Sequence, residues 1–254
     1  MSGRLKTIKI KADKQIKTFF NEQALNFSEQ HGNSKKLFIY RIKLLAEWGR
    51  FKKNDIVLDI GCGVGHHLIA LADRFTKGIG IDFSPEMIKE ARKRLQNSPL
   101  QNHISFYVDD AEEITKIENH STDIVICIGA LEHMRNRQRV FTMVNRVLKN
   151  NGRFVCLTPN GSYFWYRTMA PLFGVDTRHL STDYFLDSNE VKELLRSTGF
   201  QHSKIGYWTF IPKGDMHPLM GLSLQMFDWF GRLFKISSLR GGLVFLAKLN
   251  RNYD

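Results

Sequence analysis

The residues best suited to chemistry form a glycine-rich loop, which reads Asp59-Ile60-Gly61-Cys62-Gly63-Val64-Gly65. The loop follows a short apolar run with the composition of a strand, and a helical pattern follows the loop. Glycines after a strand let the backbone turn tightly and approach a ligand without obstruction by side chains. The loop alone therefore predicts a ligand site but not the ligand.

Two common ligands fit this loop poorly. A dinucleotide-binding loop carries a third glycine where this chain has His66, and a P-loop continues with Gly-Lys-Ser/Thr where this chain has Gly65-His66-His67. Asp59 instead places a negative charge directly before the glycines, which suits a cationic ligand such as a sulfonium with its amino group. NAD and polyphosphate are thus disfavoured.

Further acids stand where a nucleoside would lie. Asp82 ends the second apolar run, 21 residues after Gly61, at a position from which a carboxylate can accept hydrogen bonds from ribose hydroxyls. Asp109-Asp110-Ala111 ends the third run and offers an acid and backbone amides near the expected adenine ring. This spacing predicts a cofactor that contains a nucleoside.

Alternating strand-like and helical segments position these residues. From residue 55 onward, the alternation predicts an α/β fold with a doubly wound parallel sheet. Ser84-Pro85-Glu86 is a typical helix start, and Asn150-Asn151-Gly152 a typical helix end. Residues 18–50 are expected to be helical and to cap the sheet. The expected strands are residues 56–60, 78–83, 104–108, 123–128, 153–158, 203–211 and 243–249, and the expected helices are residues 65–76, 85–97, 111–117, 136–149 and 188–197.

Five segments together resemble the successive motifs of class I S-adenosylmethionine (SAM) dependent methyltransferases: VLDIGCGVG, GIGIDFSPEM, FYVDDAEEI, DIVICIGALEHM and RVLKNNGRFVCLTPN. Their order is similar to that of the branch acting on small molecules and lipids, including ubiquinone-biosynthesis-type methyltransferases. The resemblance implies a Rossmann-like, doubly wound sheet of seven strands with an antiparallel last strand. It also implies SAM as the cofactor, without a metal.

The resemblance further assigns residues to the cofactor site. Asp59, Gly61 and Gly63 would line the methionine moiety, and Asp82 would bind the ribose. The other implied contacts are Cys62 and Phe83 beside these residues, Asp110 at the adenine amino group, the Ala111 amide at a ring nitrogen, and Ile128 with Gly129 at the reacting methyl group.

Two histidines are candidates for the acceptor side. Methyl transfer from a sulfonium needs alignment and, for a hydroxyl acceptor, removal of a proton. His133, just beyond the fourth strand, lies where an acceptor would approach and is the first candidate for a general base. The alternative is that it only orders the cofactor loop or closes a helix start. His179, on a loop after the fifth strand, is the second candidate, as a base or a substrate contact.

The composition fits one globular domain with a basic surface. The 254 residues carry a formal net charge of +12 and a pI near 9.7, which favours anionic partners such as phosphate, nucleic acid or acidic membrane surface. Cys62, Cys127 and Cys156 lack CxxC spacing, which indicates a reducing compartment. The N-terminal segment has no apolar run of signal-peptide length, and the chain has no uninterrupted apolar run of membrane-span length, so we expect a cytoplasmic protein.

The two ends of the chain leave alternatives open. We expect a methyltransferase domain over residues 51–254, preceded by a basic segment and capping helices over residues 1–50. Residues 1–17 hold six lysines and arginines against Asp13, as a solvated tail or an anchor on an anionic surface. Residues 212–242 are an apolar insertion between the last two strands. It is a helix buried on the core, a lid over a greasy substrate, or an amphipathic helix lying in a bilayer surface.

These features favour methyl transfer from SAM to a small hydrophobic or lipid-like acceptor, in particular O-methylation, with possible peripheral contact to an anionic membrane. The rival enzyme class is a nucleic-acid methyltransferase, which the charge would suit. However, Ile128-Gly129-Ala130-Leu131 stands where an Asn-Pro-Pro-Tyr-like motif is typical, and no cysteine is placed for C5 chemistry. A non-catalytic SAM-binding or membrane-peripheral protein is the remaining alternative.

Overall fold

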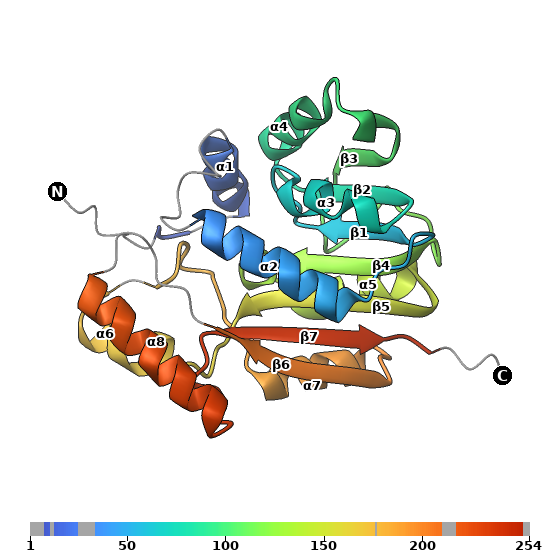
Figure 1. Ribbon diagram of the computed structural model, residues 1–254. Coiled ribbons are helices and arrows are strands. Elements are labelled where there is room, and N and C mark those ends of the chain that lie inside the picture. Colours follow the sequence, from blue (N-terminus) through green and yellow to red (C-terminus); the bar gives the residue numbers. More distant parts are fainter. Residues whose placement is uncertain (1–7, 11–12, 25–33, 176, 210–216, 251–254) are drawn as a thin grey trace.

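The computed structural model describes residues 8–10, 13–24, 34–175, 177–209 and 217–250. These residues form a seven-stranded sheet with the order β3-β2-β1-β4-β5-β7-β6 (Figure 1). β7 runs antiparallel to β5 and β6, and the other neighbours are parallel, which confirms the predicted topology. The strands are β1 (Ile56–Ile60), β2 (Lys77–Asp82), β3 (Ile104–Val108), β4 (Thr122–Ile128), β5 (Leu148–Pro159), β6 (His202–Trp208) and β7 (Gly242–Lys248).

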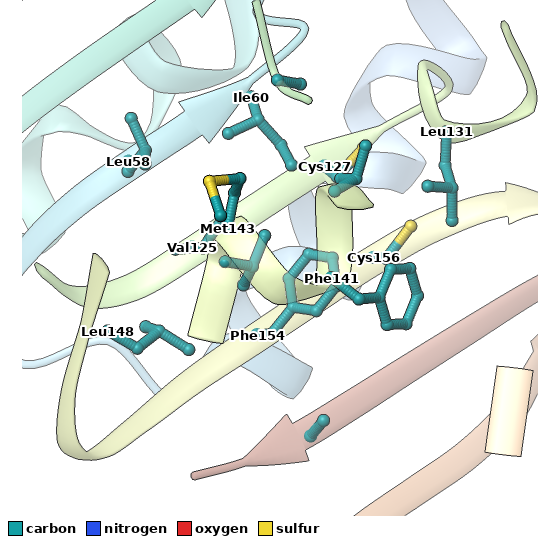
Figure 2. Packing of buried hydrophobic residues seen from close by; sticks show 14 of the residues in the cluster. Leu58, Ile60, Val125, Cys127, Leu131, Phe141, Met143, Leu148, Phe154 and Cys156 are labelled. Carbon is teal, nitrogen blue, oxygen red and sulfur yellow. The ribbon is translucent and has the colours of Figure 1, made fainter. Parts of the chain in front are cut away.

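The central strands are apolar along most of their length because helices cover both faces of the sheet. α2 (Ser34–Gly49), α3 (His66–Ala70) and α4 (Pro85–Leu95) pack on one face, and α5 (Arg137–Val147) with α7 (Ser188–Ser197) pack on the other. Figure 2 shows part of the second interface, where the Phe141 and Phe154 rings meet edge to face with centroids 5.3 Å apart. The layers are those of a doubly wound fold.

Two helices that pack on the sheet begin with N-terminal capping residues. The Ser84 hydroxyl accepts a hydrogen bond from the Met87 amide at 3.2 Å, and Pro85 occupies the first turn of α4. α7 begins with a capping box in which Asp187 and Glu190 exchange side-chain to backbone bonds. β1, β2 and β4 all end at one edge of the sheet, which brings the loops after them together.

Several predicted helices differ from the structure. Residues 111–117 form turns, because Asp109 accepts hydrogen bonds from the Thr115 hydroxyl at 3.0 Å and the Lys116 amide at 2.8 Å in place of helical bonds. The helix expected over 65–76 ends at Ala70, and a 3-10 turn follows over Ala72–Arg74. The helix expected over 136–149 ends at Val147, where β5 begins at once.

The N-terminal region also differs from the prediction. The helical stretch expected over 18–50 is two helices, α1 (Asp13–Gln23) and α2, with residues 25–33 outside the described part. α2 covers the sheet, whereas α1 lies against α4 and Ser84 donates to the Asn21 side chain at 2.6 Å. Residues 8–10 are not a free tail: the Ile8 amide donates to the His179 carbonyl at 3.0 Å. Residues 1–7 and 11–12 lie outside the described residues.

The apolar insertion forms α8 (Pro218–Leu233), which does not pack on the sheet. Its Leu224 and Met220 contact the aromatic segment after β5, where Tyr163 and Trp165 are buried, and α6 (Ala170–Leu172) completes this cluster. Figure 1 shows α6 and α8 side by side, away from the helices that cover the sheet. The interpretation as a helix buried on the core is therefore wrong. Residues 210–216, at the start of the insertion, lie outside the described part.

Candidate active site

The glycine loop forms a narrow backbone cradle at the carboxyl ends of β1 and β2. Gly61, Gly63 and Gly65 all have positive φ, of 67°, 52° and 79°, which other residues rarely adopt. A Cβ on Gly61 would lie 2.5 Å from the Cβ of Ala130, so no side chain fits there. Cys62 is buried, and its amide donates to the Ile81 carbonyl at 3.0 Å. The loop is thus fixed to β2, in a backbone conformation that depends on its glycines.

Asp59 is the most unusual group of this edge. Its side chain is buried, and neither carboxylate oxygen has a hydrogen-bond partner in the described part of the chain. Burial, and next the charge of Asp82, raise the pKa of Asp59 well above its usual range. A buried carboxyl group without a partner is costly, so this position calls for a cationic ligand group. The α-ammonium group of SAM fits it.

Asp82 sits at the end of β2 and holds the loop in place. Its Oδ2 accepts from the Gly63 amide and its Oδ1 from the Ser84 amide, both at 2.9 Å. Burial raises its pKa to about 6, against the opposing effect of these two amides and of His133. Each oxygen retains a lone pair, so ribose hydroxyls can still donate to it. Phe83 beside it is half-buried and contacts Phe20 of α1, with ring centroids 5.7 Å apart.

The predicted adenine contacts lie at the end of β3 as expected, with different degrees of exposure. Asp110 is exposed, and its Oδ1 accepts from the Glu112 amide at 2.8 Å. Ala111 is buried in the core. Asp109 is the structural member of the pair, because its carboxylate organises the following turns. Asp110 therefore accepts a local backbone hydrogen bond while its carboxylate remains exposed at the surface.

The fourth strand delivers Ile128 and Gly129 to the opposite side of the loop. Ile128 is buried, and Gly129 has a φ of 62° and donates to the Leu157 carbonyl at 2.8 Å. A Cβ on Gly129 would lie 3.2 Å from a terminal nitrogen of Arg41, which α2 contributes. The buried Arg41 Nε has no partner within the described residues. Gly129 thus faces a cation that sequence reasoning did not single out.

His133 and His179 are brought together by a third residue, Asp183. The His133 Nδ1 lies 2.7 Å from the Asp183 Oδ1, and the Asp183 Oδ2 accepts from the amides of His179 and Leu180 at 2.9 Å. The side chain of Asp183 is fully buried and that of His133 is 14% exposed. Because a carboxylate can only accept here, His133 carries its proton on Nδ1 and leaves Nε2 as an acceptor.

The surroundings shift the pKa values of both His133 and Asp183. Burial lowers the pKa of His133, but the hydrogen bond to Asp183 and the charges of Glu132 and Asp183 outweigh it, so the net shift is upward. Burial raises the pKa of Asp183, and His133 with the backbone amides outweighs it, so the net shift is downward. Phe20 covers the imidazole edge to face at 5.1 Å. The His179 ring lies 6.1 Å from that of His133.

Asp183, Arg41 and Phe20 are the site residues that sequence reasoning missed. Phe20 and Arg41 lie on helices before the glycine loop, and Asp183 lies 50 residues after His133, so no local spacing links them to the motifs. The one signal was for Asp183: a histidine proposed as a base needs a carboxylate partner, and Asp183 follows His179 closely. In the described part of the chain, no three His, Cys, Asp or Glu residues gather as a metal site.

Residues 51–199 match the family model described as "Methyltransferase domain", and the chain belongs to this family. The predicted class, SAM-dependent methyltransferase with SAM as cofactor, is confirmed. The fold and the cradle around Asp59 agree with this class.

Two curated relatives illustrate the similarity. The probable S-adenosylmethionine-dependent methyltransferase CRG1 of Saccharomyces cerevisiae is 31% identical over 56% of this chain, which spans 46% of that relative, about half its length. The demethylmenaquinone methyltransferase of Lactobacillus johnsonii is 29% identical over 70% of this chain and 78% of its own length. Among solved structures, a chain of the complex between the Haloferax volcanii Trm112 methyltransferase activator and a methyltransferase matches with a TM-score of 0.69 and 21% identity, covering 91% of this chain and 98% of that one.

Proposed function

We propose that this protein transfers the methyl group of SAM to a hydroxyl oxygen of a small hydrophobic or lipid-like acceptor, with His133 as general base. The observation that carries the proposal is the bond of 2.7 Å between His133 and the buried Asp183 at the edge of the cofactor loop. An imidazole held in this way presents a neutral Nε2, which is the arrangement needed to take a proton from a hydroxyl.

The residues of the chain divide the work between binding and proton transfer. SAM supplies, when bound, an electrophilic methyl group on a sulfonium. Asp59 would hold the ammonium group and Asp82 the ribose, with Asp110 and Ala111 at the adenine and Ile128 with Gly129 near the methyl group. As the C–O bond to the acceptor forms and the S–C bond breaks, the hydroxyl proton passes to His133 Nε2. Asp183 stabilises the imidazolium that results, because it already accepts from Nδ1.

The character of the acceptor rests on two features of the same region. Burial raises the pKa of Tyr166, in the aromatic segment after β5; the charge of Glu132 acts in the same direction and that of Arg41 opposes it. Within the described residues, Arg41 Nε has no hydrogen-bonded partner, so an acidic group on the acceptor would supply one. An amphiphilic acceptor with an apolar body and an acidic group fits both. The relative named for demethylmenaquinone supports a small-molecule acceptor.

The test begins with calorimetric titration of the purified protein with SAM, S-adenosylhomocysteine and NAD. SAM and S-adenosylhomocysteine should bind saturably, and NAD should not. An acceptor panel then pairs phenols with their carboxylate counterparts, such as 4-methylphenol with 4-hydroxybenzoate, and transfer of a labelled methyl group is measured. His133→Ala should lower turnover about 10²- to 10⁴-fold while SAM affinity stays within about threefold. Loss of SAM binding in folded His133→Ala would refute its assignment as the base.

The predicted cytoplasmic location stays a prediction. Among the described residues, no helix is both long enough and apolar enough to cross a bilayer.

A further inference from the structure

Helix α8 exposes most of its large apolar side chains and buries its one acidic side chain. Its buried stripe consists of Gly221, Leu224, Asp228 and Gly231, at the spacing of one helix face. The opposite stripe is apolar and exposed: Leu219 at 71%, Leu222 at 56%, Trp229 at 50% and Leu233 at 58%, together with Met226 and Phe230. A surface helix of a globular protein normally turns its apolar stripe inward.

The polar residue on the inner stripe explains how α8 is held in this orientation. Asp228 is buried, and its Oδ1 accepts from the Arg240 Nε at 3.2 Å and from the Gly241 amide at 3.3 Å. Gly231 permits a close approach, because a Cβ there would lie 2.6 Å from the Cβ of Leu239. A buried ion pair specifies one orientation, since turning the helix over would leave both charges unpaired. The apolar stripe is therefore fixed facing outward.

The neighbouring helix enlarges this surface. α6 ends in Leu172 and is followed by Phe173, and both side chains are exposed. Phe227 of α8 contacts Phe164 with ring centroids 5.2 Å apart, which joins the two helices into one lobe. The α6–α8 face is defined as the exposed apolar set Leu172, Phe173, Leu219, Leu222, Met226, Phe227, Trp229, Phe230, Leu233 and Phe234. An apolar set of this extent marks an interaction surface.

Among the described residues of the two helices and their flanks, the exposed charges have one sign. Within residues 163–175 and 217–241, the charged side chains that are exposed are Arg167, Arg232 and Lys235, and the one acid, Asp228, is buried in its ion pair. Basic residues beside an exposed Trp, Phe and Leu face are the composition of helices that lie in the interface of anionic membranes. A symmetric contact between two copies would instead bring these cations together without an opposing acid.

We propose that the α6–α8 face docks the protein on the surface of an anionic lipid bilayer, with α8 lying in the plane of the interface. This inference does not depend on which acceptor is methylated. Tyr166 belongs to the aromatic cluster under α8, so the docked face and the segment that follows β5 are packed together.

The test measures co-sedimentation of the full chain with vesicles of phosphatidylcholine alone and of phosphatidylcholine with phosphatidylglycerol. We expect binding to the anionic vesicles that weakens with salt, together with a blue shift of tryptophan emission. Trp48, Trp165 and Trp208 are less exposed than Trp229, so Trp229→Phe should remove most of that shift. The double variant Leu222→Glu with Leu233→Glu should lower partitioning at least about tenfold, and Arg232→Glu with Lys235→Glu several-fold.

Lys116→Glu with Lys192→Glu is the matched control for Arg232→Glu with Lys235→Glu, because both variants replace two exposed cations by two acids and Lys116 and Lys192 lie outside the α6–α8 face. It should retain vesicle binding, and every variant should retain its circular dichroism spectrum and its SAM affinity. The inference is overturned if the wild-type protein ignores anionic vesicles, or if the Leu222→Glu, Leu233→Glu variant partitions like the wild type. A wild-type dimer that this variant dissociates, with no binding to vesicles, would show that the face is a subunit interface instead.

Discussion

The cofactor edge of the sheet and the α6–α8 lobe depart from ordinary burial in opposite directions. At the cofactor edge a polar group, Asp59, is buried with no hydrogen-bond partner among the described residues. In the lobe the buried polar group, Asp228, has partners, and apolar side chains such as Leu219 are exposed. Sequences that fold well obey burial rules except where function requires otherwise, so both departures indicate sites of interaction.

The two departures call for different partners. A single enclosed carboxyl group needs one cation placed at hydrogen-bond distance, which a small ligand provides. An apolar face that extends over two helices needs a broad apolar phase, which a small ligand cannot provide. The same chain thus contains a site that selects one cationic group of a ligand and a surface that selects an extended apolar phase.

The largest effect is expected for Asp183→Asn, which changes the partner of His133. The asparagine cannot stabilise the imidazolium of His133 as a carboxylate does, so turnover should fall about 10²- to 10⁴-fold. The pKa of His133 is raised in the folded protein, so activity should rise with pH through a value above about 6.5. Removing the carboxylate leaves burial as the main influence, and the rise should move to lower pH. A pH–rate profile measures both effects.

Asp183→Glu keeps the charge and should recover part of the activity. Tyr184→Phe changes the next residue, whose hydroxyl donates to Glu190 at 2.5 Å, and should leave the profile unchanged. Turnover within about threefold of wild type in Asp183→Asn would mean that the carboxylate does not assist proton transfer.

The same substitution at the two buried acids tests the comparison directly. Asp59→Asn removes a buried charge that also lies beside the charge of Asp82, so it should stabilise the ligand-free protein by about 1–3 kcal/mol, while SAM affinity falls about 10- to 100-fold. Asp228→Asn leaves Arg240 unpaired and should destabilise the protein by about 3 kcal/mol, with SAM affinity unchanged. Urea unfolding and calorimetry measure the two quantities.

Equal loss of stability in both variants would remove the distinction between the regions. A further control is Asp55→Asn, because Asp55 is also buried and pairs with Arg153 at 2.7 Å. It should resemble Asp228→Asn in stability and leave SAM binding intact.

Local chemistry explains why the cofactor edge could be predicted from the sequence. Its residues lie on loops directly after strands, so the spacing of Asp59, Gly61 and Asp82 predicts their meeting. The central strands were predicted closely, since runs buried on both faces are continuous and apolar. The exception is β5, which begins at Leu148 and includes Asn150, Asn151 and Gly152, the residues predicted to end the preceding helix. The helix predicted over 111–117 does not form, because the side chain of Asp109 accepts hydrogen bonds from the Thr115 hydroxyl and from the Lys116 amide, which a helix would use internally.

The acceptor side and the lobe could not be predicted in the same way. Asp183 reaches His133, and Arg41 reaches Gly129, only through tertiary packing. For α8 the sequence showed an apolar helix, and the general rule that an apolar stripe turns inward would have placed that stripe against the protein, whereas it is exposed. The orientation of α8 depends on the ion pair between Asp228 and Arg240, and Arg240 lies beyond the end of the helix in the sequence.

The smallest expected effect concerns pH and the second acid of the cofactor edge. The folded pKa of Asp82 is about 6, above the unfolded value of about 4, so between these values the folded state holds a proton that the unfolded chain has released. The stability of the ligand-free protein should therefore fall as pH rises from about 4 to about 6, by at most about 3 kcal/mol from this group. Asp82→Asn should flatten that part of the curve, whereas Asp110→Asn, at an exposed position, should not. Urea unfolding across this range decides the matter, because parallel curves for wild type and Asp82→Asn would show that burial does not disfavour the charge of Asp82.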